Sequence, residues 1–300
     1  MGFTTLNPSL VVALGGRPPA PAFCEAAQQM PPLSQQLLLL NEEPMNVPPA
    51  ALLDEVGLPM DMREATERAS MSGEREVLQK PGVLPAVACA ALRAAVDANR
   101  QEKVDSVDGA PDHQLNIGHD RLRALVGAPA AARLWALVPE LLAGGGGVPR
   151  LEQAEIFIRR YSPDTRPWNP FHTDSAALTI NVALSDDAAC QGGHLLALYD
   201  GRVRRVSRRQ GDATVHSSRL LHAVSALRTG RRYSLIIFVG RSQLPPRTQW
   251  CSTRTLSYPP CTMLETQRFC RRPDRQARAP TAHSDLFKPC DVGKKKIIDG

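Results

Sequence analysis

The chain has 300 residues, a hydrophobic fraction of 43% and a formal net charge of +6. This length allows one large domain or two small ones, and the modest charge and few aromatic residues do not predict a nucleic-acid partner. No apolar stretch reaches about 18 residues, so we expect no transmembrane helix and no membrane partner. The N-terminus also lacks the basic and apolar regions of a signal peptide, so we expect a cytoplasmic or other soluble intracellular protein.

The N-terminal segment, residues 1–78, is rich in proline, alanine and glutamine and has no sustained hydrophobic period. Stretches such as GGRPPAPAF and MPPLSQQ are typical of disordered or loosely ordered chain. We predict such a region over 1–78, with one short helix over Pro49–Val56. Because the segment contains no candidate ligand residue, we expect the chemistry to be independent of it.

Periodic order is predicted from about Val77 onward. The segment VLPAVACAALRAAVDANR places Pro85 in a first turn and apolar side chains on one stripe, which indicates an amphipathic helix. A short strand is predicted over 113–117, then a helix capped by Asp120, and then a helix over 128–143 that the glycines of 144–147 end. These elements begin a predicted domain over 79–242.

From Leu151 the hydrophobic period changes from helical to strand-like. Six strand candidates follow, namely AEIFIRRYS, ALTINVAL, GGHLLALY, VRRVSRR, DATVHSS and RRYSLIIFVG. Turn residues separate them at the spacing of a β-sandwich or barrel, and no helical stretch intervenes to suggest a parallel sheet. The predicted fold is mainly β with flanking helices (α+β). It is a double-stranded β-helix, or jelly roll, with a β core at about 151–241 and the N-terminal helices packed on one sheet.

The C-terminal segment, residues 243–300, contains proline- and arginine-rich stretches and is predicted to be irregular. Four of the seven cysteines lie in it, namely Cys251, Cys261, Cys270 and Cys290. No C-x-x-C pair occurs, so we do not expect a zinc ribbon. Three alternatives stay open for these cysteines: free thiols in a reducing compartment, disulfides in a secreted protein, or metal ligands.

A candidate metal site is formed by His172 and Asp174, in the segment FHTDSAALTINVAL, together with His222. Two residues apart on a strand, the first two side chains would leave the same face. A histidine that returns from a later strand would complete two imidazoles and one carboxylate on one side of a metal. This is the ligand set of non-haem Fe(II) oxygenases, which keep the other coordination positions open. We predict these three residues as the iron ligands and catalytic residues.

A candidate co-substrate site follows from Arg232, ten residues after His222. Its guanidinium is a fixed cation suited to one carboxylate of a dicarboxylate such as 2-oxoglutarate. By strand parity, Ser234 shares the face of Arg232 and Thr179 lines the same pocket. The neighbouring Arg231 is the alternative cation. The residues together predict an iron- and 2-oxoglutarate-dependent dioxygenase.

Two long segments resemble the catalytic domain of prolyl 4-hydroxylases and lysyl hydroxylases. They are HTDSAALTINVALSDDAACQGGHL and GDATVHSSRLLHAVSALRTGRRYSLIIFVGR, within a resemblance that covers about 156–241. The shared pattern is a strand ending in Tyr, H-x-D, a TINVALN-like strand, G-G-x-L, a distal His and G-x-R-Y. The resemblance implies that Tyr161 and Asn181 contact 2-oxoglutarate and that the enzyme depends on ascorbate. The chain departs from the pattern at His194 and His216, which leaves the choice of substrate open.

The activity that this resemblance implies is hydroxylation of a prolyl or other side chain of a peptide or protein, with release of succinate and carbon dioxide. A small molecule or lipid is the alternative substrate, and a non-catalytic binding module on the same fold is the alternative of another class. The oligomeric state is left open. The arginine cluster at 202–209 is predicted to be a solvated hairpin tip, and the alternative is a surface that attracts acidic substrates.

Overall fold

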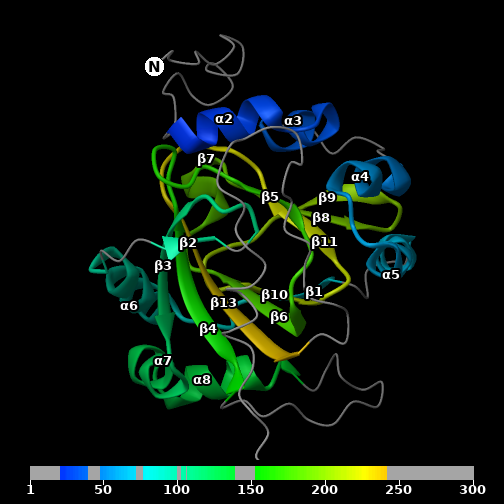
Figure 1. Ribbon diagram of the computed structural model, residues 1–300. Coiled ribbons are helices and arrows are strands. Elements are labelled where there is room, and N and C mark those ends of the chain that lie inside the picture. The colour runs from blue at the N-terminus through cyan, green and yellow to red at the C-terminus, as the bar shows by residue number, and fades with distance from the viewer. Residues whose placement is uncertain are drawn as a thin grey trace, which may run out of the picture. The chain divides into compact units, whose positions relative to one another are not determined.

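The computed structural model describes residues 21–39, 48–71, 77–99, 103–105, 107–138 and 153–241. Two antiparallel sheets dominate this part of the chain (Figure 1). The large sheet has the order β1 (Val77–Lys80), β10 (Ala213–Ser217), β6 (Ala176–Ala183), β13 (Arg232–Arg241), β4 (Glu155–Tyr161), β3 (Pro111–Ile117) and β2 (Lys103–Val104). The small sheet has the order β5 (Asn169–His172), β11 (Leu221–Val224), β8 (Leu195–Tyr199) and β9 (Arg202–Val206). The short strands β7 (Gln191–Gly192) and β12 (Leu227–Thr229) form a separate pair.

The path of the chain between the sheets is that of a jelly roll. Along the sequence, β4 lies in the large sheet, β5 in the small sheet and β6 in the large sheet again. The strands β8 and β9 then return to the small sheet, β10 to the large, β11 to the small and β13 to the large. Eight strands that wind between two facing antiparallel sheets form the jelly roll. The predicted mainly-β fold with flanking helices is therefore confirmed.

The two faces of the large sheet differ in polarity because successive side chains of a strand point to opposite faces. On the outer face, residues such as Ile158, Ile180 and Leu235 are fully buried in one apolar cluster. The helices α6 (Ala86–Asp97), α7 (His119–Val126) and α8 (Ala128–Trp135) contribute to the same cluster (Figure 1). The alternate positions, including Tyr161 and Asn181, face the small sheet. The outer face thus supplies the core, and the inner face is left available for polar groups.

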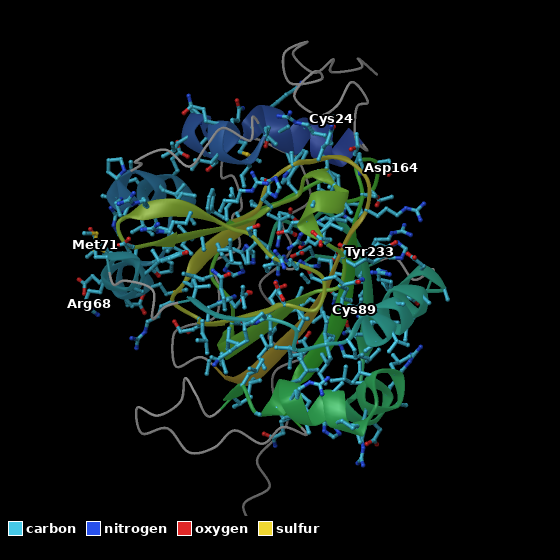
Figure 2. All side chains as sticks on the ribbon, turned by 180° about the vertical axis from the view of Figure 1, so that it is seen from behind. Cys24, Arg68, Met71, Cys89, Asp164 and Tyr233 are labelled. Atoms are coloured by element: carbon cyan, nitrogen blue, oxygen red, sulfur yellow. The ribbon has the colours of Figure 1, made fainter. Side chains whose placement is uncertain are left out.

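The helix boundaries differ slightly from those predicted. Pro85 is the N-cap of α6 and lies just before its first turn. Gly118, and not Asp120, is the N-cap of α7, and Asp120 lies in the first turn of that helix. The helix α8 ends at Trp135, and the end of the predicted helix at 139–143 lies outside the described residues. Cys89 of α6, labelled in Figure 2, is buried and forms no disulfide within the described chain.

The prediction of a disordered or loosely ordered N-terminal region is wrong for 21–39 and 48–71. These residues form α2 (Pro21–Gln29), α3 (Pro32–Leu38), α4 (Pro49–Val56) and α5 (Met60–Met71), of which only α4 was predicted. The side chains of Phe23, Leu38 and Leu53 are fully buried against residues of the small sheet and the loop before it. Each short helix buries only a few side chains, so no long hydrophobic period marks it. The prolines begin helices here, at a position where a missing N–H costs nothing.

The predicted boundary between residues 78 and 79 falls inside β1, which pairs with β10. A backbone hydrogen bond also joins the N-terminal helices to the β core, because the N–H of Ala226 donates to the carbonyl of Leu38 at 2.7 Å.

In the described parts of the chain, no helix combines the length and apolar character needed to cross a membrane. The predicted irregular tail at 243–300, with its four cysteines, lies outside the described residues.

Candidate active site

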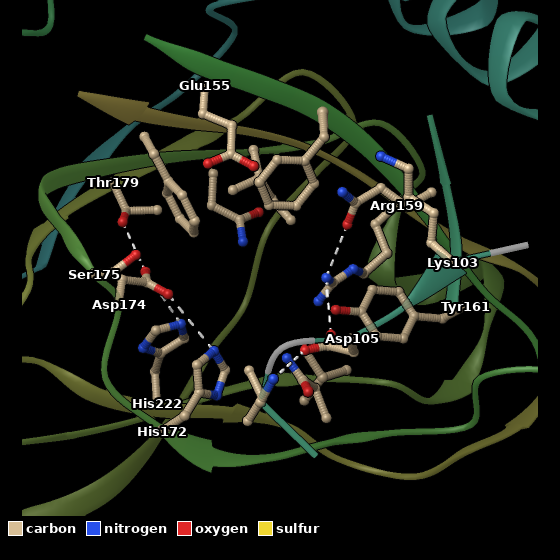
Figure 3. Close-up of a pocket in the computed structure, with 18 of the residues that line it drawn as sticks. Lys103, Asp105, Glu155, Arg159, Tyr161, His172, Asp174, Ser175, Thr179 and His222 are labelled. Carbon is tan, nitrogen blue, oxygen red and sulfur yellow. Dashed lines mark hydrogen bonds and ion pairs between the residues drawn. The ribbon is translucent and has the colours of Figure 1, made fainter. Parts of the chain in front are cut away.

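The two imidazoles of the candidate metal site are placed by strand pairing. His172 is the last residue of β5 and lies opposite His222 of β11, with ring centroids 4.3 Å apart. Asp174 was predicted to share a strand with His172, but it lies past the end of β5 in the connection to β6. The adjacent strands and this connection bring the three side chains together (Figure 3).

The donor atoms of the three side chains converge on one point. One ligand atom from each of His172, Asp174 and His222 lies within 4.8 Å of the other two. Nε2 of His172 is 3.6 Å from Oδ1 of Asp174, and Nε2 of His222 is 3.6 Å from Oδ2. Ligand bonds of about 2.1 Å at right angles would place donor atoms about 3 Å apart. Because all three residues are buried and their donor set is two imidazoles and a carboxylate, they fit an Fe(II) ion.

Neighbouring groups orient the candidate ligands. Nδ1 of His172 donates to the carbonyl of Pro170 at 2.7 Å, and Nδ1 of His222 to the carbonyl of Leu220 at 3.2 Å. A carbonyl oxygen only accepts, so the proton sits on Nδ1 and the lone pair of Nε2 faces the site. The hydroxyl of Thr179 donates to Oδ2 of Asp174 at 2.7 Å. Thr179, which was predicted as a co-substrate contact, therefore holds the carboxylate of Asp174.

His216 lies closer to this cluster than the sequence indicated. In the sequence it stands out only as a departure from the hydroxylase pattern, and it lies on β10, which ends at Ser217. Its ring centroid is nevertheless 4.7 Å from that of His222, and its Nε2 is 3.9 Å from Oδ2 of Asp174. Burial, helped by His222, lowers the pKa of His216 to about 4. His216 is thus a neutral imidazole beside the three predicted ligands at physiological pH.

Arg232 is buried and has no anionic partner in the part of the chain that the structure describes. It begins β13 opposite Tyr161 of β4, and its guanidinium carbon lies 4.8 Å from the centroid of the Tyr161 ring. Its three nitrogens and the hydroxyl of Ser234 have no hydrogen-bond partner among the described residues. Burial of an uncompensated charge costs several kcal/mol. Arg231, the alternative cation, is exposed.

The space beside Arg232 depends on a glycine. Gly193 has a φ of +68°, and a Cβ atom there would lie 2.9 Å from Cδ1 of Leu227 and 3.3 Å from Cδ of Arg232.

The next residue, His194, is half-buried, and burial together with the charge of Arg205 lowers the pKa of its imidazole to about 4. Its uncharged ring adds no positive charge near Arg232 at physiological pH.

Arg208 was not recognised from the sequence as a site residue. It was predicted to lie on a solvated hairpin tip with the other arginines of 202–209, but it is only 3% exposed. Its Nη1 donates to Oδ1 of Asn181 at 2.7 Å. The other members of the cluster fit the prediction better, because Arg202, Arg205 and Arg209 are exposed. Val203 and Val206 are both buried but have opposite strand parity, and β9 ends at Val206, so no local pattern marks Arg208 as buried.

A cavity of about 260 Å³ lies between the two sheets. One part of its wall holds the three candidate metal ligands, and Tyr161, Thr179 and Asn181 come from the large sheet. The far part is polar and charged, with Lys103, Asp105, Glu155 and Arg159 (Figure 3). Arg232 is not part of the cavity wall. Its guanidinium lies against the ring of Tyr161, and Tyr161 does line the cavity.

A buried network of ion pairs supports the charged end of the cavity. Asp105 accepts from Nη2 of Arg159 at 2.8 Å and from Nη2 of Arg166 at 3.0 Å. Arg166 also donates to Oδ1 of Asn169, the first residue of β5, at 2.6 Å. Burial raises the pKa of Asp105, but the charges of Arg159 and Arg166 outweigh it and hold the pKa at about 2. Since β5 ends with His172, the network anchors the strand that carries the first candidate ligand.

The sequence of this chain is similar to that of known hydroxylases. No family model matches the chain. The multifunctional procollagen lysine hydroxylase and glycosyltransferase LH3 is 40% identical over 87 residues in Rattus norvegicus and 38% identical in Homo sapiens. The match covers 28% of this chain and 12% of either relative, so the chain spans only a small part of these relatives. The resemblance to lysyl hydroxylases predicted from the motifs is thereby confirmed.

Solved structures with a similar chain path include two hydroxylases of the prolyl type. A prolyl-4-hydroxylase of Pseudomonas putida is 22% identical, with a TM-score of 0.41, over 61% of this chain and 100% of that chain. A prolyl hydroxylase of Trichoplax adhaerens in complex with a hypoxia inducible factor peptide is 16% identical, with a TM-score of 0.40, over 60% of this chain and 92% of that chain.

Proposed function

We propose that this protein is an Fe(II)- and 2-oxoglutarate-dependent dioxygenase. The observation that carries the proposal is the convergence of His172, Asp174 and His222 at 3.6 Å separations. A buried arginine, Arg232, has no hydrogen-bond partner among the described residues and supports it. Fe(II), when bound, would supply the oxygen activation that couples decarboxylation of 2-oxoglutarate to hydroxylation of a second substrate. Succinate and carbon dioxide would be the co-products, and ascorbate dependence is part of the same proposal.

The metal-binding part of the proposal assigns separate roles to the three ligands. His172 and His222 present Nε2 lone pairs, because backbone carbonyls hold the Nδ1 protons. Asp174 supplies the single negative charge, and the hydroxyl of Thr179 keeps its carboxylate in place. One carboxylate leaves a divalent ion with a net positive charge, which favours the binding of an anionic oxo acid.

The co-substrate part of the proposal assigns the distal carboxylate of 2-oxoglutarate to Arg232 and Ser234. Both present donors that are buried and have no partner among the described residues. The planar fork of a guanidinium matches a carboxylate with two parallel hydrogen bonds. Tyr161, which lies on this guanidinium, and Asn181, which lines the cavity, are the further contacts.

The second substrate is proposed to be a prolyl or other side chain of a peptide or protein. The similarity to a lysine hydroxylase, whose name states that it acts on procollagen, supports this choice. The charged end of the cavity, with Glu155 and Arg159, suits a polar substrate better than a lipid. A small molecule is the second candidate, because a cavity of about 260 Å³ is large enough to hold one.

Succinate release tests the proposed function. Purified protein would be supplied with Fe(II), ascorbate and 2-oxoglutarate, and screened against pools of peptides and small molecules. We expect succinate from the wild type, and neither succinate nor bound iron from Asp174→Ala, because two imidazoles alone hold Fe(II) weakly. Asp164→Ala, which removes an exposed carboxylate, is the matched control and should behave as the wild type. Full iron content and activity in Asp174→Ala would contradict the proposal and leave the binding-module alternative.

A further inference from the structure

A second arginine is buried close to Arg232. Arg208 is 3% exposed and Arg232 is 2% exposed. Burial, followed by the charge of Arg232, lowers the pKa of Arg208 to about 10, so Arg208 is still charged at neutral pH. Nε and Nη2 of Arg208 have no hydrogen-bond partner in the described part of the chain, and the same is true of every guanidinium nitrogen of Arg232. Two cations that repel each other are therefore buried with unused donors.

The nearby carboxylates do not neutralise this pair by direct contact. Asp187 accepts from the backbone N–H of Arg208 at 3.1 Å. Asp212 accepts from the backbone N–H groups of Gly82 and Arg209, at 2.9 and 2.8 Å. Both acids thus hold the loop that carries Arg208, and no ion pair joins either of them to its guanidinium among the described residues. A buried pair of cations of this kind is stabilised when an anion binds between them.

Arg208 also determines how Asn181 is oriented. A guanidinium only donates hydrogen bonds, so the atom of Asn181 that faces Nη1 at 2.7 Å is its carbonyl oxygen. The amide NH₂ of Asn181 is then directed away from Arg208. Because Asn181 lines the cavity between the sheets, this group is available there as a donor. The unused groups of Arg208 and Arg232 and the amide NH₂ of Asn181 can only donate, and the hydroxyl of Ser234 can donate as well.

We propose that Arg208 is a second cation of the co-substrate site, which makes the site selective for a dianionic oxo acid. The inference rests on the proposed function and goes beyond it, because it adds a binding residue and a basis for selectivity. With Arg232 it would share the distal carboxylate of 2-oxoglutarate. An oxo acid of equal chain length without that carboxylate, such as 2-oxopentanoate, gains nothing from either guanidinium.

Equilibrium binding of these two oxo acids tests the inference. Calorimetric titration of Fe(II)-loaded protein under nitrogen measures binding without turnover. We expect Arg208→Gln to weaken the binding of 2-oxoglutarate at least about tenfold, a typical loss for a hydrogen bond to a charged group, and that of 2-oxopentanoate by less than about threefold. Arg208→Lys keeps the charge but not the fork, so it should retain part of the selectivity. Arg209→Gln, an exposed neighbour, should bind as the wild type does.

The outcomes separate this inference from the proposed function. If Arg208→Gln weakens both oxo acids equally, Arg208 acts only by holding Asn181 and the inference is wrong. Unchanged binding of 2-oxoglutarate in Arg208→Gln also overturns it. If folded wild-type protein loaded with iron does not bind 2-oxoglutarate at all, the proposed function fails instead. Thermal unfolding shows whether each variant is folded. If Arg208→Gln does not fold, Arg208→Met, which keeps the apolar stem of the side chain, is used in its place.

Discussion

Single side chains in and beside the cavity differ in whether their polar groups are already paired. Asp174 and Asn181 have partners that orient them, namely the hydroxyl of Thr179 and the guanidinium of Arg208. Arg232 and Ser234 are as deeply buried, but their donors have no partner among the described residues. Buried polar groups in folded proteins are usually satisfied, so unsatisfied ones in a cluster indicate a ligand site.

Replacement of Arg232 should weaken the use of 2-oxoglutarate. Removing one partner of a buried carboxylate–guanidinium pair costs roughly 2–5 kcal/mol, so Arg232→Ala should raise the KM for 2-oxoglutarate on the order of 30-fold or more. Steady-state kinetics with varied 2-oxoglutarate measures this change. Arg231→Ala is the matched control, because that side chain is exposed. An unchanged KM in Arg232→Ala, with the loss in Arg231→Ala, would reverse the assignment of the two arginines.

Secondary-structure elements around the cavity are joined by the buried ion pairs of Asp105. This residue follows β2, while its partners Arg159 and Arg166 lie on β4 and just before β5. The network therefore connects the edge of the large sheet to the small-sheet strand that ends at His172. Burial of these charges is tolerated because they are paired. Without Asp105, Arg159 would keep only Asp112 as an ion-pair partner in the described network, and Arg166 only Asp108.

Asp105→Asn should destabilise the fold by about 3 kcal/mol at neutral pH, since two buried arginines lose a shared partner. The pKa of Asp105 in the fold is about 2, below its ordinary 3.8, so its ionised form contributes stability above about pH 4. That contribution is lost as the pH falls toward 2, and the difference between the variant and the wild type should narrow over this range. Urea unfolding at several pH values measures the difference.

The control for this prediction is Asp54→Asn, which removes a more exposed ion pair with Arg63. Exposed ion pairs contribute at most about 1 kcal/mol, so this variant should unfold close to the wild type. Equal stability of Asp105→Asn and the wild type at neutral pH would show that the network does not hold the sheets together.

The molecule as a whole depends on apolar contacts between its N-terminal helices and the small sheet. Phe23 of α2 is fully buried and contacts Trp168 edge to face, with ring centroids 5.2 Å apart. Leu198 and Leu221 of the small sheet belong to the same apolar cluster. Without the helices, the outer face of this sheet would be exposed to water, and large exposed apolar patches promote aggregation.

A truncated chain that starts at Val77 should therefore be insoluble or markedly less stable, contrary to the expectation from composition. Phe23→Ala should lower the free energy of unfolding by about 3–5 kcal/mol, as is usual for a deeply buried phenylalanine. Met60→Ala, at a side chain that is 77% exposed, should change it little. Chemical unfolding and size-exclusion chromatography measure these effects. A soluble truncated chain with the stability and iron content of the full chain would refute the role of the helices.

The sequence by itself determined the class of the fold and the residues of the candidate metal site. Strand periodicity is a local property, and it predicted the longer strands β4, β6, β8, β9, β10 and β13. It missed the short strands, among them β5 and β11, which carry His172 and His222. The residue types and their order selected the two histidines and Asp174 because few ligand sets suit Fe(II), and the structure brings these three together.

Only the tertiary structure decided which of the remaining polar and apolar residues are buried. Arg208 and the exposed Arg209 are neighbours of one type, and the position of the loop between the sheets separates them. Asp105 meets Arg159 and Arg166 across more than fifty residues, which no local pattern records. The N-terminal helices are short and proline-rich, so their order depends on the apolar sheet face that they cover. Burial is a property of contacts between distant segments, and such contacts exist only in the folded chain.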